Sequence, residues 1–207
     1  METISIHRPK IVVIGSCNTD MVVKANRLPV PGETILGGTF YMNPGGKGAN
    51  QAIAAARLGA EVTFISKIGY DLFGLQALEI YRSEKINTEY IFTDQKSPSG
   101  VALISVDSFG ENSIIVAPGA SRSLSIEDIN KAEEKIKEAD IILMQLEIPI
   151  DTVEYAATIA CKYGKKVILN PAPASSLSNS FLMNVHTILP NRIEAEMLSG
   201  IKVMNIE

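Results

Sequence analysis

The sequence predicts an α/β fold in which helices cover both faces of an open, mostly parallel β-sheet. Strand and helix patterns alternate from Lys10 to Lys85 and again from Asp140 onward, and this order builds parallel βαβ units. The first strand pattern contains the β-branched run Ile11–Ile14, which suits a strand buried on both faces. Two segments, at about 19–42 and 90–117, interrupt the alternation. We expect them to form a small antiparallel sheet that projects from the core.

The individual elements follow from residue type and spacing. An alanine-rich run with small side chains predicts a helix over Gly48–Leu58, and Gly59 can cap its end. Asp128 stands three residues after Ser125, as in a capping box. The predicted strands are Lys10–Gly15, Thr34–Tyr41, Glu61–Ile68, Gly100–Val106, Ser113–Val116, Ile141–Gln145, Lys166–Leu169 and Ile188–Leu189, and the other helices are Phe73–Lys85, Ser125–Glu138, Asp151–Tyr163 and Glu194–Ser199.

Composition excludes several classes of protein. The net charge of −4 provides no basic surface for nucleic acid. No apolar run is long enough to span a bilayer, and the first ten residues lack the apolar stretch of a secretory signal. Two cysteines and two histidines are too few and too scattered for a disulfide framework or a zinc site. We therefore expect a cytoplasmic protein with no membrane or nucleic-acid partner.

Asn18 and Asp20 follow the first predicted strand. In extended backbone, residues two apart point to the same side, so the amide and the carboxylate would converge at the carboxyl edge of the sheet. Open α/β folds bind their ligands at that edge. A polyhydroxylated ligand needs such donors and acceptors, because each buried hydroxyl must be paired. Taken alone, the two residues favour a turn, because Asn and Asp commonly end strands.

The run Gly45-Gly46-Lys47-Gly48-Ala49-Asn50 precedes the alanine-rich helix. Glycines permit unusual backbone angles and close approach of a ligand, and a helix N-terminus offers free N–H groups. The run is not a Walker phosphate loop, because no Ser or Thr follows Lys47 and the glycine spacing differs. The first strand also lacks the G-x-G-x-x-G fingerprint of dinucleotide-binding proteins.

The run from Gly45 to Ala52, with Gly59 and Gly69 at their spacings, resembles the N-terminal signature of the ribokinase-like (PfkB) carbohydrate kinases. Further matches stand in the expected order and cover nearly the whole chain: Asn18-Thr19-Asp20, Pro31-Gly32-Glu33, Met144-Gln145-Leu146-Glu147, Asn170-Pro171-Ala172-Pro173-Ala174, and Pro190-Asn191 with Glu194. The resemblance implies the family's Rossmann-type open sheet. It also implies a single but partial domain over residues 1–207, lacking the C-terminal part of the fold, with the two interrupting segments interleaved as a lid sheet.

The resemblance also assigns roles to single residues. Sugar-binding positions of the family match Asn18, Asp20, Gly46, Lys47, Asn50 and Glu147, while Ala102 and Ile104 would face the sugar from the lid. Asn191 and Glu194 match the N-x-x-E motif, which implies a nucleotide-phosphate contact at Asn191 and a Mg²⁺ contact at Glu194. Arg192 and Ile193, within that motif, differ from the Glu-Thr pair expected there. The lid sheet implies a homodimer.

The implied reaction transfers the γ-phosphate of ATP to the 5-hydroxyl of D-ribose. The family's Gly-Ala-Gly-Asp motif, whose aspartate is the general base, does not occur between Lys96 and Glu207. We therefore expect that base, most of the ATP site and the loop for a monovalent cation such as K⁺ beyond Glu207, and an inactive truncated chain. The alternatives are a sugar-binding or assembly module without chemistry, and a kinase for another sugar or nucleoside.

Overall fold

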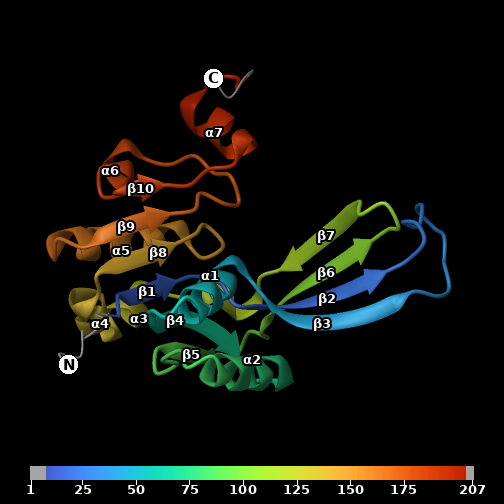
Figure 1. Ribbon diagram of the computed structural model, residues 1–207, viewed down its shortest axis with the longest axis horizontal. Coiled ribbons are helices and arrows are strands. Elements are labelled where there is room, and N and C mark those ends of the chain that lie inside the picture. The colour runs from blue at the N-terminus through green and yellow to red at the C-terminus, as the bar shows by residue number, and fades with distance from the viewer. Residues whose placement is uncertain (1–7, 204–207) are drawn as a thin grey trace, which may run out of the picture.

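The computed structural model describes residues 8–203, and its core is a six-stranded sheet. The strand order is β10-β9-β8-β1-β4-β5, and all neighbours are parallel, as Figure 1 shows. This arrangement confirms the predicted fold class. The core strands are β1 (Lys10–Ile14), β4 (Glu61–Gly69), β5 (Ile91–Asp94), β8 (Ile141–Met144), β9 (Lys166–Leu169) and β10 (Thr187–Ile188).

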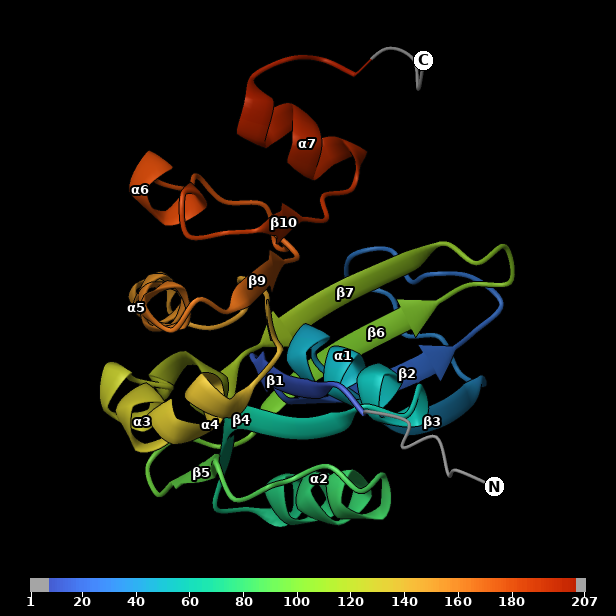
Figure 2. The same cartoon turned by 60° about the vertical axis from the view of Figure 1, so that its left-hand side comes forward.

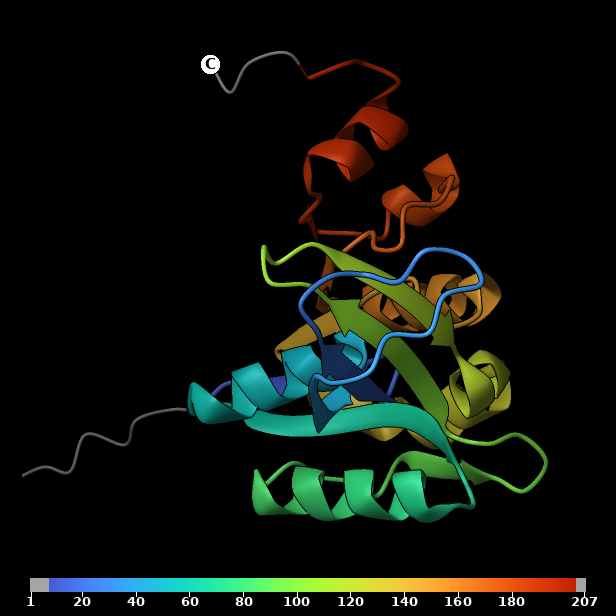
Figure 3. The ribbon, with the colours of Figure 1, turned by 90° about the vertical axis from the view of Figure 1, so that its right-hand side faces the viewer.

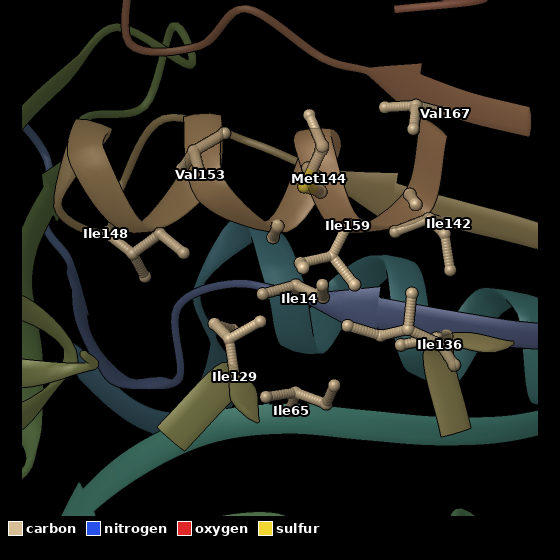
Figure 4. Packing of buried hydrophobic residues seen from close by; sticks show 14 of the residues in the cluster. Ile14, Ile65, Ile129, Ile136, Ile142, Met144, Ile148, Val153, Ile159 and Val167 are labelled. Carbon is tan, nitrogen blue, oxygen red and sulfur yellow. The ribbon is translucent and has the colours of Figure 1, made fainter. Parts of the chain in front are cut away.

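Helices pack on both faces of this sheet, as predicted. One face carries α1 (Lys47–Arg57) and α2 (Leu72–Ser83), and the other carries α3 (Ile126–Lys131), α4 (Glu133–Glu138) and α5 (Ile150–Lys162), visible on opposite sides in Figure 2. Side chains alternate along β1, so Val12 and Ile14 enter one buried cluster and Val13 the other. Figure 4 shows Ile14 of β1 among the isoleucines of α3, α4 and α5.

The second sheet, called the lid sheet below, has the order β3-β2-β6-β7. It extends away from the core in Figure 1 and lies toward the viewer in Figure 3. Its strands are β2 (Asn18–Lys24), β3 (Thr39–Gly45), β6 (Gly100–Val106) and β7 (Asn112–Ala117). The prediction of an antiparallel sheet was wrong for one pair, because β2 and β6 are parallel. Both strands leave the same edge of the core, one after β1 and the other after β5, and they therefore run in the same direction.

Other differences are local. The predicted helix Ser125–Glu138 is divided at Ala132 into α3 and α4, while the capping box of Ser125 and Asp128 is confirmed. The strand predicted over Thr34–Tyr41 begins later and runs into the glycine motif as β3. The patterns did not predict the 3₁₀ helix η1 (Gly119–Ser123) or α6 (Asn179–Leu182). They also assigned residues 90–117 to the lid, whereas β5 at the start of that segment pairs with β4 in the core sheet. The last helix of the described residues is α7 (Arg192–Ser199), which the left-handed Gly200 closes as predicted.

The two cysteines are unpaired, Cys17 buried and Cys161 exposed. Burial raises the pKa of the Cys17 thiol to about 11, and its Sγ lies 2.9 Å from the hydroxyl of Tyr81. This thiol is therefore an uncharged core group. Within residues 8–203, no helix combines the length and apolar character that crossing a bilayer requires.

Candidate active site

A pocket of about 450 Å³ opens where the lid sheet meets the carboxyl edge of the core sheet. Its walls come from the β1–β2 junction, the start of α1, the segment that leaves β7, the segments after β8 and β9, and α7. The lining residues are Ser16, Asn18, Lys47, Val116, Pro118, Arg122, Leu146, Glu147, Ala172, Pro173 and Glu194. Four of the predicted site residues, Asn18, Lys47, Glu147 and Glu194, are among them.

Glu147 connects three elements of the pocket. Its carboxylate accepts hydrogen bonds from the Ser16 hydroxyl and, at 2.9 Å, from the backbone N–H of Lys47. Its other oxygen lies 3.7 Å from Lys47 Nζ. The carboxylate therefore stands at the positive end of α1 and beside a lysine, where negative charge is favoured. This arrangement fixes an acceptor group in the pocket that a hydroxyl-bearing ligand could share.

The glycines at the start of α1 let its backbone approach the β1–β2 junction. Gly46 has φ of 91°, and a Cβ there would lie 2.9 Å from the backbone nitrogen of Asn18. The first amides of the helix already have partners, since Lys47 N–H donates to Glu147, and the Gly48 and Ala49 N–H groups donate to Ser16. The run therefore supplies a side-chain site rather than a backbone cradle for phosphate.

Asn18 and Asp20 lie on β2 with their side chains on the same face, as the extended spacing predicted. Asn18 is 5% exposed, and its Oδ1 has no hydrogen-bond partner among the described residues. Such an orphan acceptor is costly unless a ligand or an ordered water satisfies it. Its neighbours Gly45 and Gly100 pair with it across the lid sheet, and a Cβ at Gly100 would lie 2.1 Å from that oxygen.

Asp20 lies next to these groups, although it does not line the pocket. Burial and the nearby Glu147 raise the pKa of its carboxyl above the usual 3.8, and Lys47 opposes that shift. A Cβ on Gly45 would overlap the Asp20 carboxylate, so glycine at that position leaves room for the acid. The three charged side chains of Asp20, Lys47 and Glu147 thus form one electrostatic group.

The remaining predicted sugar-binding residues are placed less directly. Ala102 and Ile104 share a face of the lid sheet with Asn18 and Asp20, and Val116, paired with Ala102, reaches the pocket. Gly46 precedes Lys47 at the junction but is not a lining residue. Asn50 is exposed on the first turn of α1 and does not line the pocket.

Asn191 and Glu194 form a reciprocal capping box at the start of α7. Glu194 accepts from the Asn191 backbone N–H and side-chain amide at 2.8 Å each, and donates its own N–H to the Asn191 side chain at 2.9 Å. Glu194 is 7% exposed yet lines the pocket. Each carboxylate oxygen keeps a free lone pair, so the group fits a water-mediated contact to Mg²⁺. No cluster of three or more potential metal ligands occurs within residues 8–203.

Sequence reasoning missed several lining residues. Ser16 and Arg122 are polar, and the others are apolar: Val116, Pro118, Leu146, Ala172 and Pro173. Ala172 and Pro173 belong to the Asn170–Ala174 match, and Leu146 precedes Glu147 in another. Their motifs therefore signalled the site although no role was given to the residues. Arg122 and Ser16 carried no such signal, because only the folded chain brings them to the pocket.

Comparisons with known proteins identify the family of the chain. Residues 8–207 match the profile described as "pfkB family carbohydrate kinase". Over 196 residues, or 95% of the chain, the sequence is 46% identical to a ribokinase of Haemophilus influenzae, and it covers 64% of that relative. A deoxyribokinase of Salmonella typhimurium is 40% identical over 194 residues, or 93% of this chain and 63% of the relative.

A solved structure of Arabidopsis thaliana ribokinase, complexed with ribose and ATP, superposes with a TM-score of 0.84 at 32% identity, covering 97% of this chain and 65% of that one. The chain thus spans slightly less than two thirds of the length of these proteins. The family match covers almost the entire chain, and the chain therefore belongs to the pfkB family of carbohydrate kinases.

Proposed function

We propose that the protein phosphorylates D-ribose on its 5-hydroxyl with ATP, and that the described pocket is the sugar-binding half of the site. The observation that carries the proposal is the orphan Oδ1 of Asn18, buried beside the Lys47–Glu147 pair. An acceptor without a protein partner needs a donor from outside the chain, and a sugar hydroxyl that enters the pocket is such a donor. The relatives named ribokinase support ribose as the sugar.

The sugar hydroxyls would contact a group of side chains that hold both donors and acceptors. We assign this role to Asn18, Asp20, Gly46, Lys47, Asn50 and Glu147, with Ala102 and Ile104 closing from the lid sheet. The ammonium of Lys47 donates, the carboxylates accept, and the Asn18 amide can do both. The side chain of Asn50 is exposed on α1, so a sugar could contact it only by extending beyond the residues that line the pocket.

The phosphate donor would be ATP, accompanied by Mg²⁺. Asn191 would contact nucleotide phosphate, and Glu194 would hold Mg²⁺ through water at the pocket wall. Bound Mg²⁺ would neutralise charge that develops during phosphoryl transfer. The proton-accepting aspartate and the loop for a monovalent cation such as K⁺ are proposed to lie outside the 207 residues.

Two further proposals concern the setting of the enzyme. The outer face of the lid sheet exposes Phe40, Met42, Leu103 and Ile115, and a row of apolar residues of this kind favours a homodimer formed through the lid. The unpaired thiols Cys17 and Cys161 fit a reducing, cytoplasmic location.

Calorimetry with the 207-residue chain tests the sugar assignment. We expect D-ribose to bind, and Asn18→Ala to weaken binding about 10-fold or more, because a buried hydrogen bond is lost. Asn26→Ala is the matched control, since Asn26 is an exposed lid residue outside this pocket. A folded chain that binds no ribose would refute the proposal.

The deoxyribokinase relative makes deoxyribose the second candidate sugar. A thermal-shift panel of ribose, deoxyribose, fructose and adenosine separates the candidates, because at equal concentration the ligand that binds most tightly stabilises the native state most. The largest shift with deoxyribose would replace ribose in the assignment. We expect the 207-residue chain to bind ribose without turnover. Ribose-dependent ATP consumption by this chain would contradict the placement of the proton-accepting aspartate outside it.

A further inference from the structure

Arg122 is a charged residue of the pocket to which neither the sequence motifs nor the proposed sugar site gives a role. It lies on η1, is exposed and lines the pocket together with Lys47, Glu147 and Glu194. Within residues 8–203, no hydrogen bond or ion pair engages its guanidinium. A planar guanidinium at a pocket wall with no internal partner is free to bind an anion.

The other positive groups that line the pocket already have partners within the protein. Lys47 Nζ lies 3.7 Å from Glu147, and the leading amides of α1 donate to Glu147 and Ser16. Among the lining residues, Arg122 is therefore the cation whose charge no neighbouring carboxylate in the described chain neutralises. A negatively charged ligand that enters this pocket would meet Arg122 as its unpaired counter-charge.

The backbone that carries Arg122 is anchored on both sides. The Ser121 hydroxyl accepts from the Cys17 N–H at 3.2 Å and donates to the Cys17 carbonyl at 3.3 Å, which links η1 to the start of β2 and thus to Asn18. On the other side, the Ser123 hydroxyl bonds to Asp94, and the Ser123 carbonyl accepts from Lys67 at 3.1 Å. These bonds hold the Cα of Arg122 at a fixed place relative to the sugar-binding residues.

We propose that Arg122 binds the phosphate group of a phosphorylated pentose, which is the product of the proposed reaction. This inference rests on the proposed function, because that reaction is what places a phosphate monoester beside Asn18 and Lys47. Arginine suits the role, since its donors match two phosphate oxygens at once. More than one ligand could carry a phosphoryl group to this place beside the sugar, and we assign the sugar phosphate as the one that Arg122 binds.

Isothermal titration of the 207-residue chain with ribose 5-phosphate tests the proposal. Arg122→Gln should weaken binding of ribose 5-phosphate about 10- to 100-fold, the loss expected for charge-assisted hydrogen bonds, and should leave ribose binding unchanged. Arg122→Lys should restore part of the affinity. Arg82→Gln is the matched control, because Arg82 is an exposed arginine of α2 that does not line the pocket.

The outcomes separate this inference from the function on which it rests. Ribose binding with Arg122-independent binding of ribose 5-phosphate would overturn the role of Arg122 and leave the sugar site intact. Arg122-dependent binding of ribose 5-phosphate without ribose binding would support the anion site and refute the sugar kinase assignment. If Arg122→Gln weakens binding of Mg-ATP but not of ribose 5-phosphate, the guanidinium serves the donor instead, and the proposal is wrong.

Discussion

The substitution Gly48→Ala sets two effects of known size against each other. Gly48 is the second residue of α1, and alanine would improve helix propensity by at most about 1 kcal/mol. A Cβ at this position would lie 2.7 Å from the carbonyl carbon of Gly15 and 2.7 Å from two backbone atoms of Ser16, well inside the 3.4 Å at which ordinary contact begins. These neighbours are backbone atoms and cannot turn aside as a flexible side chain would, so either α1 or the β1–β2 junction must shift to admit the added Cβ.

Overpacking of this kind costs about 1–3 kcal/mol, which exceeds the gain in propensity. We expect Gly48→Ala to lower the free energy of unfolding by about 1–2 kcal/mol, equivalent to roughly 2–8 °C in Tm for a chain of this size. Urea and thermal denaturation followed by circular dichroism measure the change. The variant should also bind ribose more weakly, because α1 carries Lys47 and the junction carries Ser16.

A matched control isolates the propensity term. Ala54 lies on the exposed face of α1. Ala54→Gly should lower the free energy of unfolding by about 1 kcal/mol through helix propensity alone, with ribose affinity unchanged. If Gly48→Ala instead raised the stability of the protein by about 1 kcal/mol, the close approach of α1 to the β1–β2 junction would not be the reason for glycine at this position.

Three further changes test the core and the site. Lys67→Met removes the nearer of two lysine partners of Asp128, bonded at 2.7 Å with side chains 16% and 6% exposed. Lys131 at 3.9 Å and Ser125 still contact the carboxylate, so the loss in chemical denaturation should be about 1–3 kcal/mol. Lys137→Met, from an exposed pair, should cost less than about 1 kcal/mol. Ile136→Ala empties a fully buried position (Figure 4) and should cost about 2–5 kcal/mol by the same measurement, and a loss below about 1 kcal/mol would argue against the packing shown. Burial and Glu147 raise the pKa of Asp20, so on acidification its carboxylate is protonated at a pH above the usual 3.8. Ribose affinity measured by calorimetry should therefore fall in that range, and Lys47→Met, which removes the group that lowers this pKa, should move the fall to higher pH. An unchanged affinity across the range would remove Asp20 from the site.

Much of the fold follows from local pattern. The β-branched run of β1 and the alanine-rich α1 specify their own conformations, and the predicted bounds Lys166–Leu169 match β9. What the pattern could not provide was the direction of strand pairing. The parallel pairing of β2 and β6 depends on where both strands leave the core, and no residue in either strand encodes it. The break at Ala132 likewise depends on how α3 and α4 each pack against α5.

The site shows the same division. Asn18, Lys47, Glu147 and Glu194 belong to recognisable motifs, and the structure brings all four to one pocket. Arg122 belongs to η1, a single 3₁₀ turn that no periodicity predicts, and its place depends on the bonds of Ser121 and Ser123 to distant residues. Asn50 illustrates the opposite case, because its motif suggested the site and its side chain lies exposed on α1.

The carboxylate of Glu147 also has a consequence for folding kinetics. Its bonds to Ser16 and Lys47 join residues separated by 131 and 100 positions, and contacts of such long range form only after the intervening chain has closed. The β1–β8 ladder bridges a similar separation, since Ile11 pairs with Ile141, so we expect ribose binding to recover only after this part of the core sheet has closed. Recovery of binding, timed against recovery of secondary structure, would separate that step from the earlier ones.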